Sequence, residues 1–136
     1  MKAMNLSVSD RLEILDVLAG ADNAASLRDA DAYVELFTDD ASLDGAQGAH
    51  AGKETLRQAV GSIWAREGLA SLHLTLNPTL AMAAGDNDEV IAHSVLLIVK
   101  PGTSPQVLNV SRITQRLKRV GTSWRISHRT VNSNFP

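Results

Sequence analysis

The 136-residue chain has no cysteine, no long apolar run and no strong excess of one charge. Without cysteine it can form no disulfide, thiolate nucleophile or cysteine-ligated metal site. Its longest strongly apolar run, residues 95–99, is far shorter than the ~20 residues that span a bilayer. The formal net charge of -2 provides no positive field for a nucleic-acid backbone or an anionic lipid surface. We therefore expect neither nucleic acid nor membrane as a partner.

Several functional signatures are also missing. The first residues lack the apolar stretch of a signal peptide, and Asp10 and Arg11 place charges directly after them, so we expect a cytoplasmic protein. The four histidines show no paired spacing of the kind that holds a metal ion. The Gly-x-Ser-x-Gly elbow of hydrolases is absent as well. We expect no metal and no other cofactor.

Length and pattern predict one compact domain, residues 1–136, of the α+β class. Ser7 or Ser9 can cap a first helix, Asp29 can cap a short second one, and a third carries Leu56, Val60 and Trp64 at helical spacing. From about residue 71 the period becomes alternating and β-branched residues become frequent. We expect a short strand at 41–44, a glycine-rich loop at 45–52, and strands at 72–82, 89–100, 106–119 and 123–131. Together they predict a curved sheet folded around helices.

The alternation within the long strands indicates which side chains face the interior. Asn109, Ile113 and Gln115 share one face, which we expect to line a cavity, whereas Arg112 and Arg116 lie on the other. The amides of Asn109 and Gln115 can orient a ligand carbonyl or can be satisfied within the strand ladder.

Two histidines are candidates for the same interior. Trp124, Ile126 and His128 share a face, so His128 reaches the interior if the two apolar residues do. Simple pleating instead places His73 on the face away from Leu72 and Leu74, which argues against an interior position for His73.

Several segments together resemble the SnoaL-like branch of the nuclear transport factor 2-like superfamily. The clearest is Leu36-Phe37-Thr38-Asp39-Asp40-Ala41-Ser42-Leu43-Asp44, which joins a helix end, an acidic turn and a strand; weaker matches are Asp10-Arg11-Leu12-Glu13-Ile14, Arg28-Asp29-Ala30-Asp31, Gly52-Lys53-Glu54-Thr55-Leu56 and Trp124-Arg125-Ile126-Ser127-His128-Arg129. The resemblance implies a cone of three N-terminal helices packed in a curved, mostly antiparallel sheet around an apolar pocket. Relatives of this type include scytalone dehydratase, steroid isomerases and polyketide cyclases.

The chain departs from these relatives at their catalytic positions. The Tyr-Asp pair of the dehydratases falls, by spacing, on Ala25 and Ser26, and the acid of the long strand falls on Gln115. The strand histidine is matched by His73, against the pleating argument. The base of the isomerases falls on Gly45, and Asp44 lies one residue earlier. In a regular strand this offset turns the Asp44 side chain to the opposite face, whereas a strand that has already bent into the loop lets Asp44 enter the cavity.

The resemblance implies a small apolar-ligand-binding domain, and we expect a cofactor-independent proton-transfer enzyme of the isomerase, dehydratase or cyclase type acting on a cyclic substrate. Asp44 is the expected base, with His73 or His128 as its partner. The expected pocket residues are Trp64, Asn109, Ile113, Gln115 and Trp124. The alternative is a non-catalytic ligand-binding or assembly domain, which the missing Tyr-Asp pair and Gln115 favour. The resemblance also implies a homodimer through the outer sheet face around Val110, Arg112, Thr114 and Arg116.

Overall fold

The computed structural model describes residues 6–45, 48–67, 71–83 and 88–133, in which three helices and six strands form an α+β fold. The α+β class was predicted correctly. The elements follow the order α1 (Val8–Ser26), α2 (Ala30–Glu35), β1 (Phe37–Gly45), β2 (Gly48–Ala51), α3 (Lys53–Glu67), β3 (Leu72–Met82), β4 (Glu89–Lys100), β5 (Gln106–Val120) and β6 (Ser123–Asn132).

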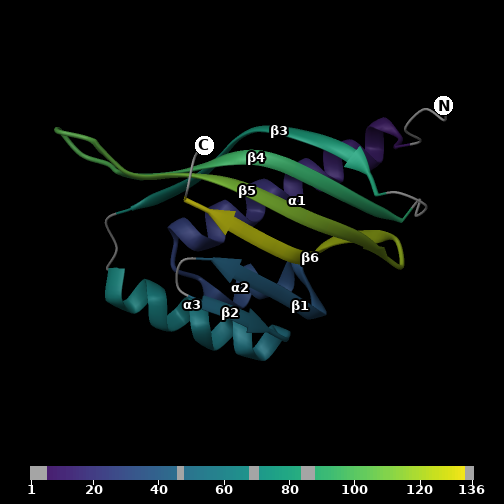
Figure 1. The fold of residues 1–136 in the computed structure, drawn as a ribbon, viewed down its shortest axis with the longest axis horizontal. Coiled ribbons are helices and arrows are strands. Elements are labelled where there is room, and N and C mark those ends of the chain that lie inside the picture. The colour runs from purple at the N-terminus through teal and green to yellow at the C-terminus, as the bar shows by residue number, and fades with distance from the viewer. Residues whose placement is uncertain (1–5, 46–47, 68–70, 84–87, 134–136) are drawn as a thin grey trace.

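The six strands form one curved sheet in the order β2-β1-β6-β5-β4-β3 (Figure 1). The sheet is mixed, because β1 runs parallel to β6 while the other neighbouring strands are antiparallel. The helices do not form one N-terminal block, since β1 and β2 lie between α2 and α3. β2 also occupies residues 48–51 of the predicted glycine-rich loop, of which residues 46 and 47 lie outside the described part of the chain.

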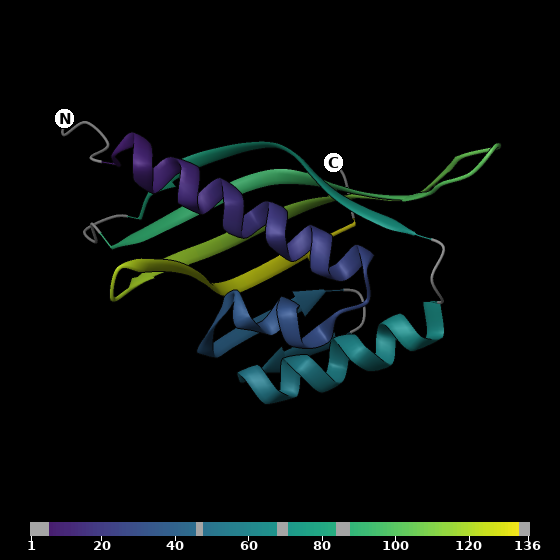
Figure 2. The same cartoon turned by 180° about the vertical axis from the view of Figure 1, so that it is seen from behind.

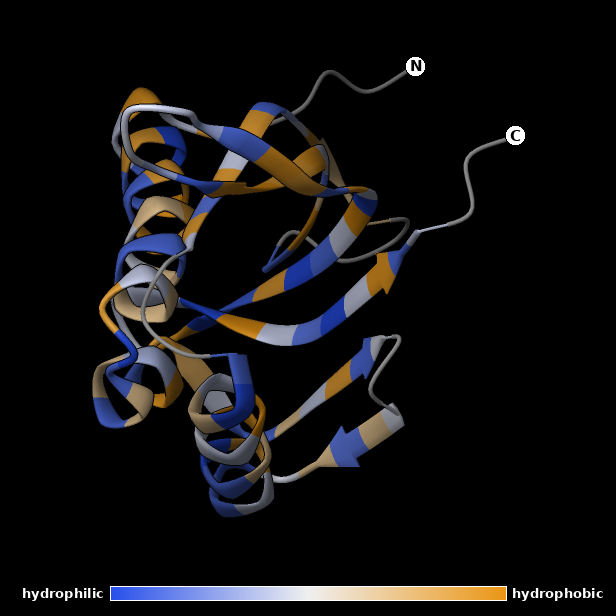
Figure 3. Ribbon diagram, turned by 90° about the vertical axis from the view of Figure 1, so that its left-hand side faces the viewer, coloured by the Kyte–Doolittle hydropathy of each residue, from blue (hydrophilic) through white to orange (hydrophobic). Residues whose placement is uncertain are grey.

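All three helices lie on one side of the sheet (Figures 2 and 3). The long helix α1 crosses the inner face next to β3, and α3 lies against β1 and β2. No helix in the described segments combines the length and apolarity needed to cross a membrane.

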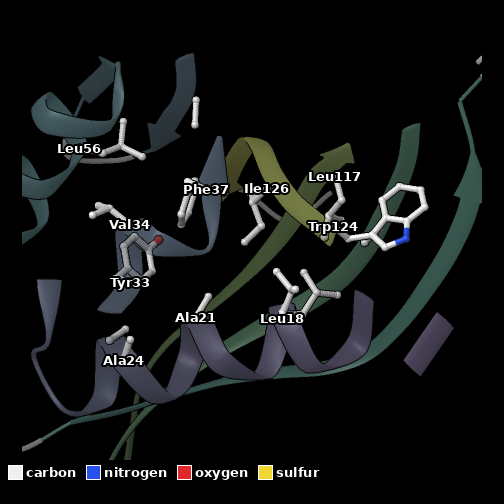
Figure 4. Close-up of a cluster of buried hydrophobic side chains, with 14 of the residues drawn as sticks. Leu18, Ala21, Ala24, Tyr33, Val34, Phe37, Leu56, Leu117, Trp124 and Ile126 are labelled. Atoms are coloured by element: carbon white, nitrogen blue, oxygen red, sulfur yellow. The ribbon is translucent and has the colours of Figure 1, made fainter. Parts of the chain in front are cut away.

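Helix α1 is shaped for close packing on the sheet. Ser7 caps it by accepting the N–H of Asp10 at 2.9 Å, and small buried residues such as Ala21 let its backbone approach the strands. Figure 4 shows Leu18 and Ala21 pointing toward Ile126 and Leu117 of the sheet. These contacts form a dry core at one end of the inner face.

The C-terminus of α1 ends in a Schellman arrangement. The N–H of Arg28 donates to Ala25 O at 3.1 Å and that of Asp29 to Ala24 O at 2.9 Å, with Arg28 in the left-handed region at φ 58. The Arg28 guanidinium donates onward to Ser71 Oγ at 2.6 Å. The helix end is therefore tied to the segment that leads into β3.

Register shifts decide which side chains face the helices. In β6, Ile126 pairs with Leu117 and His128 with Arg116, so Ser127 has no register partner on β5. The shift interrupts the two-residue alternation. Trp124, Ile126 and Arg129 are consequently buried under the helices, while His128 lies on the opposite face with Ser42.

Candidate functional site

A cavity of about 560 Å³ lies at the end of the inner face opposite the dry core, and residues from all three helices and all six strands line it. This volume suits one small organic ligand. Most of the wall is apolar: Tyr33, Val60, Ile63, Trp64, Leu96 and Ile98. Tyr33 and Trp64 meet edge-to-face, with ring centroids 5.3 Å apart. The cavity can therefore take up a flat or cyclic apolar group.

His73 is a buried titratable group of this wall. It is 9% exposed and lines the cavity from β3. Its backbone N–H donates to Ser26 Oγ at 2.9 Å, and its ring Nε2 is buried without a hydrogen-bond partner among the described residues. Burial, with Arg129 and Arg28 acting in the same direction, lowers the pKa of His73 to about 4. The ring is therefore neutral at neutral pH.

Asp22 is a second buried titratable group, and the sequence analysis missed it. Its Oδ2 accepts the N–H of Thr75 at 2.6 Å, and its Oδ1 is buried without a partner in the described segments. Burial raises the pKa of this carboxyl, against the opposing effects of Arg129 and the hydrogen bond from Thr75. The available signal was its spacing, four residues after Leu18 and therefore on the apolar stripe of α1.

Together, Asp22 and Ser26 cover the outer edge of β3. They lie one helical turn apart on α1 and accept the N–H groups of Thr75 and His73, which are two residues apart on this edge strand. The same two contacts fix His73 in the cavity wall and place the Asp22 carboxylate next to the strand segment that carries it.

The structure places Asp44 and His128 outside the cavity, unlike the prediction. Asp44 is exposed, because the pleat of β1 turns Leu43 and Gly45 to the cavity and the residue between them away. His128 lies on the outer face after the register shift, where Nδ1 contacts Ser42 Oγ and Nε2 lies 2.9 Å from Thr130 Oγ1. These two side chains do not meet His73.

The predicted pocket residues divide between the cavity and the core. Trp64 and Asn109 line the cavity, and Asn109 Oδ1 accepts a hydrogen bond from Ser111 Oγ. Ile113, Gln115 and Trp124 are buried but are not part of the cavity wall. The dry core occupies the end of the sheet where Trp124 lies. Strand alternation therefore predicted correctly that these side chains are buried, but it does not distinguish the cavity wall from the core.

Further polar side chains line the cavity without having been predicted. His50 on β2 and Arg129 on β6 contribute to its wall. Within the described ranges no three His, Asp or Glu side chains come together as a metal site. Nothing in the sequence pattern pointed to Arg129, because strict alternation from Trp124 assigns it to the outer face.

Solved structures with the same fold are similar to this chain over nearly its whole length. A protein of unknown function with a cystatin-like fold from Nostoc punctiforme matches with TM-score 0.86 and 23% identity, covering 96% of each chain. A hexachlorocyclohexane dehydrochlorinase from Novosphingobium barchaimii matches with TM-score 0.79 and 17% identity, covering 94% of this chain and 88% of that one. ActVI-ORFA from Streptomyces coelicolor matches with TM-score 0.79 and 16% identity, covering 89% and 95%.

At these identities the structural likeness shows the fold and leaves the reaction open. A comparison with curated protein sequences gives no match. The sequence pattern of the SnoaL-like domain matches residues 6–130. The same pattern spans both the dry core and nearly all of the cavity wall, and the chain therefore belongs to the SnoaL-like domain family.

Proposed function

We propose that the chain is a cofactor-independent proton-transfer enzyme of the isomerase, dehydratase or cyclase type that acts on a small cyclic substrate. The observation that carries this proposal is His73, a buried and neutral imidazole on the wall of an apolar cavity large enough for such a molecule. A neutral imidazole is the form that accepts a proton from a carbon acid.

The surroundings of His73 define how such a base works. Arg129 and Arg28 disfavour the imidazolium form, so a proton taken up by His73 is returned quickly to the substrate or passed on. Asp22 interacts electrostatically with Arg129, and its carboxylate is held at Thr75, two residues along the strand that carries His73; when it is ionised, it offsets part of the positive charge of Arg129. We assign His73 as the proton acceptor and Asp22 as a positioning residue that offsets part of the charge of Arg129.

One structural neighbour supports this type of reaction. The hexachlorocyclohexane dehydrochlorinase is named for removing hydrogen chloride from a ring compound, and this chain combines the same fold with a cavity that has aromatic walls. A cyclic substrate from which a proton is removed fits both observations.

Deuterium exchange tests the proposal without knowledge of the product. The protein is incubated in D₂O with a panel of cyclic ketones, and deuterium incorporation is followed by mass spectrometry. We expect His73→Gln to lower the exchange rate by roughly two to four orders of magnitude, and Asp22→Asn to lower it as well. Asp44→Asn is the matched control and retains the rate, because Asp44 is exposed outside the cavity. An unchanged rate in His73→Gln contradicts the proposal.

A second candidate function, assembly, is favoured by the outer face of the sheet. Leu72, Leu74 and Leu76 of β3 are each 39% exposed there, and Val110 of β5 is 43% exposed. Half-exposed apolar side chains in a row are typical of a surface that a partner covers. We propose that a second copy of the chain covers this face, which gives a homodimer. Absence of exchange with every ketone, together with dimer formation, makes assembly or simple ligand binding the better account.

A further inference from the structure

Arg129 has an environment that is unusual for an arginine. The side chain is 4% exposed and projects from β6 into the cavity wall. On the neighbouring strands its register partners are Gln115 of β5 and Leu43 of β1, neither of which carries a charge. The register shift at Ser127 is what brings Arg129 to this face.

No described carboxylate forms an ion pair with Arg129. The ion pairs of the described residues involve other cations, such as Arg57 with Glu54 and Arg119 with Asp10. The guanidinium forms no hydrogen bond with any described residue, and its one ring contact is with Tyr33, whose centroid is 5.9 Å away. Such a long contact compensates little of the charge.

Burying a charge without a partner is costly, and buried charges in proteins are normally paired. Asp22 and Arg129 influence each other electrostatically, but Asp22 Oδ2 is engaged with Thr75. Glu67, the carboxylate of the described cavity wall, is exposed and forms no ion pair with Arg129. A ligand that brings its own negative charge removes this cost. Five N–H donors in a planar fork are suited to a carboxylate, which they bind in a bidentate manner.

We infer that the ligand of this cavity carries a carboxylate that pairs with Arg129, attached to an apolar ring that lies among Tyr33, Ile63 and Trp64. This inference rests on the proposed function in that it names the substrate class of the same cavity. The cyclic substrate is then an acid, with the proton that His73 removes on its ring. The carboxylate fixes the orientation of the ring relative to His73, because it is held at a single point of the wall.

Two matched probes test the inference. The folded protein is titrated by calorimetry at neutral pH with cyclohexanecarboxylate and with cyclohexanecarboxamide, which have the same ring and differ in charge. We expect the carboxylate to bind about tenfold to a hundredfold more tightly, as for a hydrogen bond to a charged group. Equal affinities, or no binding of either probe at millimolar concentration, overturn the inference.

Three variants separate Arg129 from general electrostatics. Arg129→Gln should abolish the preference for the carboxylate while retaining binding of the amide. Lys100→Gln removes the other lysine or arginine in the described cavity wall, which is exposed, and should retain the preference. Arg129→Lys keeps the positive charge and should retain part of the preference for the carboxylate. It also replaces Arg129→Gln as the test variant if Arg129→Gln melts below the assay temperature. A preference that survives in Arg129→Gln, or loss of both probes in folded Arg129→Lys, contradicts the inference.

These outcomes are independent of catalysis. Carboxylate binding by a protein that exchanges deuterium neither with neutral cyclic ketones nor with cyclic ketones that carry a carboxylate leaves the ligand inference standing and removes the enzyme. Exchange of neutral cyclic ketones by a protein that shows no preference for the carboxylate probe leaves the enzyme standing and removes the ligand inference.

Discussion

Burial is the largest cause of the lowered pKa of His73, and two arginines on different elements act in the same direction. Arg129 contributes from the cavity wall, and Arg28 from the end of α1, where its guanidinium is fixed to Ser71. The protonation state of the candidate base therefore depends on how α1 ends as well as on the cavity itself.

The pH dependence of activity reflects this arrangement. The folded-state pKa of about 4 lies below the ordinary value of 6.5, so the neutral base persists to lower pH than a free imidazole does. We expect the acid limb of kcat/KM to fall near pH 4, and Arg28→Ala to move it upward because a positive charge is removed. The pH–rate profile, measured with any ketone that the protein exchanges, gives the position of this acid limb in the unmodified protein and its shift in Arg28→Ala. Arg57→Ala, at an arginine paired with Glu54, is the control, and a limb near 6.5 in the unmodified protein contradicts the expected pKa.

The residue-level site was only partly predictable from the sequence. His73 was uncertain because pleating was combined with the assumption that Leu72 and Leu74 face inward, whereas these leucines lie on the outer face of an edge strand. His128 was assigned to the interior by an alternation that the unpaired Ser127 interrupts. Asp22 carried a usable signal, a carboxylate on the apolar stripe of a helix.

At the scale of elements, β3 contains a bulge that has a clear local cause. Pairing with β4 shifts between Leu76 and Thr79, where Pro78 has no N–H to donate and Asn77 adopts the left-handed region at φ 54. Asparagine tolerates this conformation better than most residues do. The bulge lies between the strand segment that carries His73 and the segment that enters the dry core.

Substitution at Asn77 measures the cost of this bulge. We expect Asn77→Val to destabilise the fold by about 1–2 kcal/mol, because a β-branched residue resists positive φ. Asn77→Gly, the matched control, should change stability by less than about 1 kcal/mol. Urea unfolding of both variants gives the comparison. Equal destabilisation by valine and glycine shows that the Asn77 side chain, rather than its backbone conformation, serves the bulge.

Elements with a clear period were predicted well, and elements defined by long-range pairing were not. The strand 72–82 was expected with an interruption near Pro78 and is observed as Leu72–Met82 with the bulge there. β1 begins at Phe37 rather than at residue 41, because Phe37 pairs with Ile126, which is distant in the sequence. Polar residues at 38–40 are typical of a turn, and no local pattern reveals such a partner.

At the scale of the whole molecule, the inner face of the sheet is divided between a dry core and the cavity, while the outer face is left without a covering helix (Figure 3). The row of half-exposed leucines on β3 continues toward Val110 of β5 through the outward residues of β4. Apolar and cationic side chains thus share this outer face, since Arg112 and Arg116 lie on the same side of β5 as Val110.

The proposed homodimer can be tested at this face. Light scattering at tens of micromolar should give twice the 14.5 kDa mass of the chain, as expected when an apolar sheet face is covered by a second copy. Leu74→Glu should give the monomer mass, because it places a charge in the centre of the row. Leu27→Glu is the control, at an exposed leucine between α1 and α2. A monomer in the unmodified protein, or a dimer in Leu74→Glu, contradicts the proposed interface.

The unpaired Ser127 also has a consequence for how such proteins diverge. Deletion of the single residue 127 would restore alternation and leave Arg129 on the cavity face, because inward Ile126 would then be followed by outward His128 and inward Arg129. If instead the bulge were lost while every residue of the strand was kept, the rest of β6 would slip by one residue, Arg129 would leave the cavity and its neighbours in sequence would enter it. Within a lineage, a substitution that removes the bulge can therefore take a buried positive charge out of the cavity without any change at Arg129 itself. Homologues in which β6 has the same length but pairs with β5 without this shift are where a change of ligand charge should be sought first.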